Sequence, residues 1–88
     1  MDILLDGNTL LNKDLLFKSL KNQINSEDFI GNNLDSLWDV LTSSKEDIIL
    51  TIVHSKQLEN NLGEYYTKLI SLFNELKDTE TKVTITIK

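Results

Sequence analysis

Two aspartates, Asp35 and Asp39, are the residues of this sequence whose spacing could support chemistry. They lie four positions apart in a segment that we expect to be helical, so both carboxylates project from one side of the helix. Paired carboxylates can act as an acid–base couple or hold a divalent metal ion. Either role needs burial or further acidic ligands, and an exposed helix edge supplies neither. We therefore expect no enzymatic activity, no cofactor and no metal site.

No lysine or arginine is placed to neutralise this acidic pair. The helix dipole can account for Asp35, because a negative charge is favourable in the first turn of a helix. It cannot account for Asp39, which lies beyond the first turn, is a poor helix former and repels the like charge four residues away. Two interpretations stay open, ordinary solvated acids or a recognition surface for a basic partner.

The rest of the sequence carries no other pattern of catalytic residues. The single histidine, His54, has no nucleophile or acid at a recognisable spacing, and a solvated histidine at a strand end explains it. The absence of cysteine excludes a thiol nucleophile, disulfides and thiolate metal sites. The basic residues are scattered rather than gathered with aromatic residues, so we expect no nucleic-acid binding.

Length and composition are typical of one small globular domain, which we expect to span residues 1–88. No apolar run approaches the roughly 20 residues needed to cross a bilayer, and Asp2 stands where a secretory signal would carry a basic residue. We expect a cytoplasmic protein without membrane association. The net charge of −5 favours a basic partner, although it also serves solubility.

The apolar periodicity predicts alternating strands and helices. Asn12 and Asn33 are the expected N-caps of the first two helices. The β-branched run 48–53 predicts a strand covered on both faces. Strands separated by helices in so short a chain are expected to pair in parallel, so the predicted fold class is α/β, a three-stranded parallel sheet with three to four packed helices. The expected strands are 2–5, 48–53 and 82–88, and the expected helices are 13–24, 34–43 and 61–77, with residues 55–60 compatible with a further helical turn.

The predicted helix 34–43 has an apolar face and an acidic edge. Its apolar residues recur at i, i+3, i+4 and i+7 and include Trp38. At about 100° per residue, Asp35, Asp39 and Thr42 fall within about 60° of one another beside that face. The helix is therefore expected to be anchored on one side and to present carboxylates on the other.

The stretch FIGNNLDSLWDVLT, residues 29–42, resembles the signature of the barstar family, the intracellular inhibitors of barnase-type ribonucleases. The matching pattern is an aromatic residue, Gly31, and then Asn-Leu-Asp, Leu-Trp-Asp and Leu-Thr. A looser similarity extends over nearly the whole chain, including the last helix and the closing strand. The resemblance implies the fold predicted above. It also implies an inhibitor that plugs the basic active site of a secreted or delivered ribonuclease.

The resemblance also implies roles for individual residues. Asp39 is implied to mimic a substrate phosphate, and Asp35 is implied to face the basic rim of the nuclease. Trp38 and Leu34 are implied to anchor the helix and add contact area, while Glu75 adds a salt link from the last helix. The remaining implied partner contacts, in the loop before the helix and at its end, are Phe29, Gly31, Asn33 and Thr42.

Four positions before and at the end of the predicted helix 34–43 depart from the barstar pattern. Phe29 and Ile30 stand in place of two tyrosines, and Ser43 and Ser44 stand in place of a Gly-Trp pair. These changes keep the acidic residues and remove much of their aromatic surround. We therefore expect a cognate ribonuclease other than barnase, bound by a protein that is monomeric when free. The alternative is a barstar-like interaction module with a non-nuclease partner.

Overall fold

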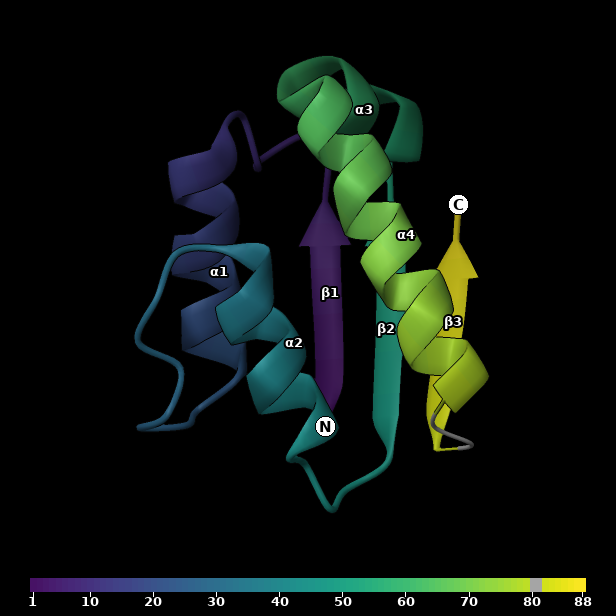
Figure 1. Cartoon of the computed structure of the whole chain (residues 1–88). Helices are drawn as coiled ribbons and strands as arrows, with labels where there is room; N and C mark the ends of the chain where they lie inside the picture. The colour runs from purple at the N-terminus through teal and green to yellow at the C-terminus, as the bar shows by residue number, and fades with distance from the viewer. Residues whose placement is uncertain (80–81) are drawn as a thin grey trace.

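The computed structural model describes residues 1–79 and 82–88, and this part of the chain contains three strands and four helices. The strands form one parallel sheet in the order β1-β2-β3, with α2 and α4 in front of it and α1 beside β1 (Figure 1). The predicted α/β fold class is confirmed. In chain order the elements are β1 (Asp2–Asp6), α1 (Lys13–Gln23), α2 (Leu34–Thr42), β2 (Ile48–Val53), α3 (Ser55–Leu62), α4 (Glu64–Thr79) and β3 (Val83–Ile87).

Each strand is joined to the next by two helices, which is how short parallel strands are connected. In the register of the sheet, Ile3 lies opposite Leu50 and Leu5 lies opposite Ile52. All four side chains are buried, because alternate residues of a strand share one face and the helices pack on that face.

The expectation that β2 is covered on both faces is wrong. Ile48, Leu50 and Ile52 are buried, whereas Ile49 on the opposite face is 47% exposed. A run of β-branched residues favours extended backbone whether one face is buried or both. The continuous apolar run therefore predicted the strand correctly and its surroundings incorrectly.

The helix expected over 61–77 is instead two helices that meet at Gly63. α3 ends at Leu62 and α4 begins at Glu64, and Gly63 between them has a φ of 60°. The Gly63 N–H donates to the carbonyl oxygen of Glu59, which closes the last turn of α3. Glycine adopts a positive φ without the steric cost of a side chain, and this conformation ends helices. Residues 55–62 are thus a helix in their own right.

The buried apolar residues form one cluster between the helices and the sheet. Phe17 and Phe73 are its largest fully buried members, and α2 contributes Leu37, Val40 and Leu41. Burial of each such side chain stabilises the fold by about 1.5–3 kcal/mol relative to its exposure. In the part of the chain that is described, no helix combines the length and hydrophobicity needed to cross a membrane.

Candidate functional site

The helix α2 is held in place at its start and along one face. Asn33 is its N-cap, as predicted, and its Oδ1 accepts a hydrogen bond from the Ser36 N–H at 2.8 Å. Leu37 and Leu41 are buried in the core, while Trp38 is half-buried at the border of the helix with α4. This anchoring fixes where the remaining side chains of α2 point.

Asp35 and Asp39 are both exposed on the outer side of α2. Among residues 1–79 and 82–88, no lysine nitrogen lies within 4.0 Å of either carboxylate. The ion pair found in the described part of the chain joins the N-terminal amine of Met1 to Glu46 at 3.7 Å. The two aspartates therefore keep their full capacity to pair with charges from another molecule.

The two aspartates border different hollows. Asp35 lines a groove of about 430 Å³ between α2 and α4, together with Leu34, Trp38 and Glu75. Asp39 lines a second hollow, of about 700 Å³, between α2, its following loop and the segment before it. α2 therefore separates two places at which a partner can approach a carboxylate.

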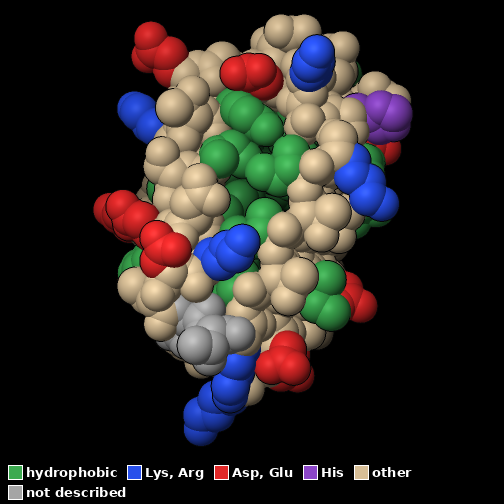
Figure 2. Space-filling model, turned by 90° about the vertical axis from the view of Figure 1, so that its right-hand side faces the viewer, with side chains coloured by type: hydrophobic (Ala, Val, Ile, Leu, Met, Phe, Trp, Pro, Cys, Tyr) green, Lys and Arg blue, Asp and Glu red, His purple; other side chains and the backbone are tan. Residues whose placement is uncertain are grey.

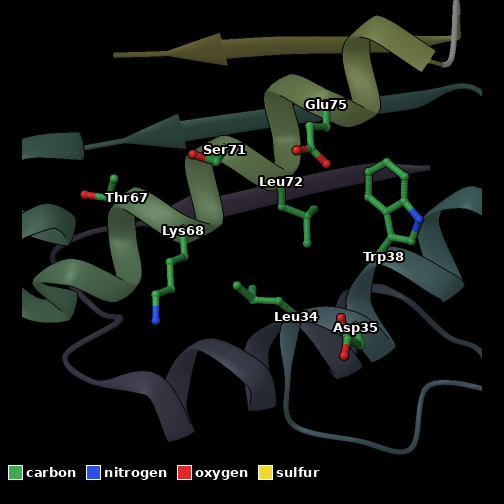
Figure 3. A pocket seen from close by; sticks show the side chains of 8 residues that line it. All are labelled: Leu34, Asp35, Trp38, Thr67, Lys68, Ser71, Leu72 and Glu75. Atoms are coloured by element: carbon green, nitrogen blue, oxygen red, sulfur yellow. The ribbon is translucent and has the colours of Figure 1, made fainter.

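The groove between α2 and α4 combines an apolar floor with charged ends. Figure 3 shows Leu34 and Leu72 in its middle, and Asp35 and Glu75 at the end where Trp38 lies. Lys68 lies toward the other end (Figure 3). The fold thus brings Glu75, from the far half of the chain, to the same groove as Asp35.

The hollow beside Asp39 is lined mainly by small polar side chains. Ser43 and Ser44 contribute hydroxyl groups, and Asp28 and Glu46 add two further carboxylates. Short side chains after α2 leave space there that a partner can fill. The remaining lining residues are Met1, Asn25, Ser26, Val40 and Lys45.

The acidic charge of the chain is concentrated around α2. The segment 25–47 holds six acidic residues against one lysine, a net charge of −5, which equals the net charge of all 88 residues. The rest of the chain, with eight acids and eight lysines, is neutral overall. This asymmetry could have been counted in the sequence and would have pointed to Asp28 and Glu46, which the pairwise spacing argument missed.

The loop before α2 is tied to α1 by an aromatic residue. Phe29 is only 5% exposed and packs edge-to-face on Phe17 with ring centroids 6.3 Å apart. Lys21 donates to the carbonyl oxygen of Ile30 at 2.7 Å, and its ammonium lies 5.5 Å from the Phe29 ring centroid. Phe29 offers little surface to a partner, whereas Ile30 is 79% exposed.

Gly31 and Thr42 lie at the two ends of this site. A Cβ at Gly31 would collide with the Ser36 hydroxyl, so the Ser36 side chain would have to move if Gly31 were replaced. The Thr42 hydroxyl donates to the Trp38 carbonyl oxygen at 2.8 Å. Its proton is used within α2, which leaves the hydroxyl oxygen as an acceptor for a partner.

The single histidine and the acidic pair lie at different places on the surface. Among the residues described, no group of three or more His, Cys, Asp or Glu side chains could hold a metal ion. His54 is exposed in the turn between β2 and α3, where it adopts a left-handed backbone with a φ of 52°. It borders a different surface hollow from Asp35 and Asp39.

The chain is similar to known proteins in sequence. All 88 residues match the family model described as Barstar (barnase inhibitor). A curated protein of Bacillus subtilis (strain 168), named "Putative ribonuclease inhibitor YrdF", is 29% identical over 77 residues. That alignment covers 86% of this chain and 85% of the relative.

Proposed function

The chain belongs to the barstar family, a family of inhibitors rather than enzymes, and on this premise we propose that it inhibits a ribonuclease by covering the enzyme's active site with α2 and the loop before it. The observation that supports the proposal is the pair of exposed carboxylates on α2, which have no lysine nitrogen within 4.0 Å in the part of the chain that the structure describes. A ribonuclease active site must hold an anionic phosphate, so it presents basic groups that match such a surface.

Asp39 is the residue that enters the position of the substrate phosphate. A carboxylate offers two oxygens to basic donors, and charge-assisted hydrogen bonds are the stronger kind. The hollow beside Asp39 leaves room for the donors of the enzyme to surround it. Occupation of that place excludes RNA, so inhibition is competitive.

Asp35 and Glu75 bind a second basic side chain of the enzyme. The groove between them is lined by Trp38, Leu34 and Leu72, which suits the aliphatic stem of a lysine or an arginine. The charged head then meets two carboxylates. Lys68 at the other end of the groove repels a second basic group, which fixes the direction of entry.

The loop before α2 completes the interface. Gly31 faces the enzyme, and so does the side-chain NH₂ of Asn33. The Oδ1 atom of Asn33 already accepts the hydrogen bond that caps the helix, so the NH₂ group is the part of this side chain left for the enzyme. Phe29 holds the loop on α1, and the exposed side chain of Ile30 contacts the enzyme. Thr42 contributes its hydroxyl oxygen at the end of the helix.

The enzyme inhibited is a cognate ribonuclease that differs from barnase. The small side chains of Ser43 and Ser44 leave the hollow beside Asp39 open, and the cognate enzyme fills it with side chains of its own. The nuclease is secreted or delivered. The inhibitor is cytoplasmic and protects the cell that makes it. When no nuclease is bound, the inhibitor is a monomer.

The test is inhibition of RNA cleavage. Purified protein is titrated against a panel of barnase-type ribonucleases that includes barnase and the nucleases encoded by the same organism. We expect stoichiometric inhibition of at least one of them, and its loss in the double variant Asp35→Ala/Asp39→Ala. Glu59→Ala, an exposed acid on α3, is the matched control and should inhibit like the wild type. If no nuclease is inhibited, a pull-down from the producing cell with the same variants tests the alternative, a non-nuclease partner.

A further inference from the structure

The two edges of the sheet differ in how their backbone groups are satisfied. On the outer edge of β1, the Leu4 N–H donates to Gln23 Oε1 at 2.6 Å, and Gln23 Nε2 donates to the Leu4 carbonyl oxygen at 2.8 Å. Gln23 Nε2 also donates to the Ser19 hydroxyl at 3.0 Å, which fixes the amide. The Gln23 side chain thus occupies the place of a further strand at Leu4, in the middle of this edge.

Among the residues that the structure describes, none covers the outer edge of β3 in this way. β3 bonds to β2 through alternate residues, as in the hydrogen bond from the Lys88 N–H to the Ile52 carbonyl oxygen at 2.8 Å. The intervening residues of a parallel strand direct their N–H and C=O groups away from that neighbour. Those of Ile85 and Ile87 therefore face outward, and no residue within 1–79 or 82–88 supplies them with a partner.

An apolar strip accompanies this open edge. Tyr66 and Ile70 of α4 and Ile85 of β3 are only partly buried, and Ile87 is 46% exposed. Figure 2, which faces this side of the molecule, shows hydrophobic side chains recessed between two ridges of other atoms. A fourth strand placed here would satisfy the free backbone groups of β3 and bury apolar side chains against the strip.

Charge decides which kind of strand fits. β3, with the sequence VTITI, is uncharged and is flanked by Lys82 and Lys88. A second copy of the chain, paired antiparallel about Ile85, would set the flanking lysines of one copy opposite those of the other. Like charges directly opposite each other destabilise a sheet. A strand with an acidic residue at each end would instead pair with both lysines.

We infer that the outer edge of β3 binds an extended segment of another protein, in which apolar residues alternate between acidic ends. In such strand addition the main-chain hydrogen bonds give affinity and alternate side chains give specificity. β3 lies at the opposite edge of the sheet from β1, away from α2 (Figure 1). The inference therefore does not depend on the proposed inhibition of a ribonuclease.

The probe is the synthetic peptide acetyl-Glu-Val-Thr-Val-Thr-Val-Glu-amide, titrated into isotope-labelled protein and followed by NMR shifts of the backbone amides. We expect saturable shifts in β3 and in the adjoining face of α4. The same peptide with its central valine N-methylated lacks the N–H that faces Ile85, and should bind at least about tenfold more weakly. A peptide with lysine in place of both glutamates should also bind more weakly.

Two variants of one residue separate backbone pairing from side-chain packing. Ile87→Pro removes an outward N–H without removing a hydrogen bond to β2, which an edge strand tolerates. Ile87→Ala keeps that N–H and loses the side chain. We expect peptide binding to be lost in the proline variant and retained within about threefold in the alanine variant, with both giving folded spectra. Absence of saturable shifts in the wild type, equal binding of the N-methylated peptide, or dimerisation of the protein through β3 would each overturn the inference.

Discussion

Asp35 on α2 and Glu75 on α4 line one groove from two different helices, with Trp38 at the same end (Figure 3). If both carboxylates bind one basic side chain, the two residues cannot contribute independently. We expect Asp35→Ala and Glu75→Ala each to weaken binding of the inhibited ribonuclease by about 1–3 kcal/mol, and the double variant to lose less than the sum. A calorimetric double-mutant cycle measures this coupling, and strictly additive losses would show two separate contacts.

The acidic surface around α2 should govern how fast the partner is found. The net charge of −5 in residues 25–47 attracts a basic enzyme over a distance that salt shortens. We expect the association rate constant to fall about tenfold between about 50 mM and 500 mM salt, with a much smaller change in the dissociation rate constant. Stopped-flow mixing at several salt concentrations gives both rates. A salt-independent association rate would contradict electrostatic steering.

Removal of the carboxylate at position 39 should stabilise the free protein. Asp39 lies in the interior of α2, four residues from a like charge and without a lysine nitrogen within 4.0 Å among the residues described. Asp39→Ala replaces a poor helix former with the best one, so the free energy of unfolding should rise by about 0.5 kcal/mol. Urea denaturation measures the change. A loss of stability would mean that Asp39 serves the fold and not a partner.

The N-cap residue of α2, Asn33, should contribute more to the stability of the protein than the asparagine just before it. Asn33 accepts a hydrogen bond from the Ser36 N–H, whereas Asn32 is an exposed residue of the same type just before it. We expect Asn33→Ala to lower the free energy of unfolding by about 1 kcal/mol, and Asn32→Ala to change it by less than about 0.5 kcal/mol. Equal effects in denaturant titrations would argue against the cap.

The break between α3 and α4 depends on a backbone conformation that few residues adopt. Gly63 has a φ of 60° and a ψ of −131°, and a Cβ added there meets no atom within 4 Å. Gly63→Ala should therefore lower the free energy of unfolding by about 1–3 kcal/mol through backbone strain alone. Asn60→Ala, at an exposed position of α3, serves as the control. A Gly63→Ala variant as stable as the wild type would mean that the chain can form one continuous helix through position 63.

Patterns of local origin in the sequence predicted the fold well. The N-caps Asn12 and Asn33 and the helices after them follow from side-chain chemistry and periodicity within a few residues. The open face of β2 could not be predicted in this way. Ile48 and Ile49 are the same residue type, yet Ile48 is buried in the core and Ile49 is exposed. Burial of that kind depends on where distant helices pack.

The same dependence on distant packing applies to the candidate site. The unneutralised acids of α2 can be seen in the sequence, and the family resemblance pointed to Glu75. The separation of Asp35 and Asp39 into two hollows could not be seen, because α4 forms one hollow and the loops around α2 form the other. The burial of Phe29 against Phe17 likewise depends on the packing of the loop on α1.

The most direct test is the dissociation constant of the complex with the ribonuclease that is inhibited best, measured for the wild type and for Asp39→Ala, with Glu59→Ala as the control. If Asp39 takes the place of the substrate phosphate, its truncation should raise the dissociation constant by at least about 30-fold, which corresponds to about 2 kcal/mol, while the control leaves it unchanged. An Asp39→Ala variant that binds as tightly as the wild type would contradict the proposed mode of inhibition.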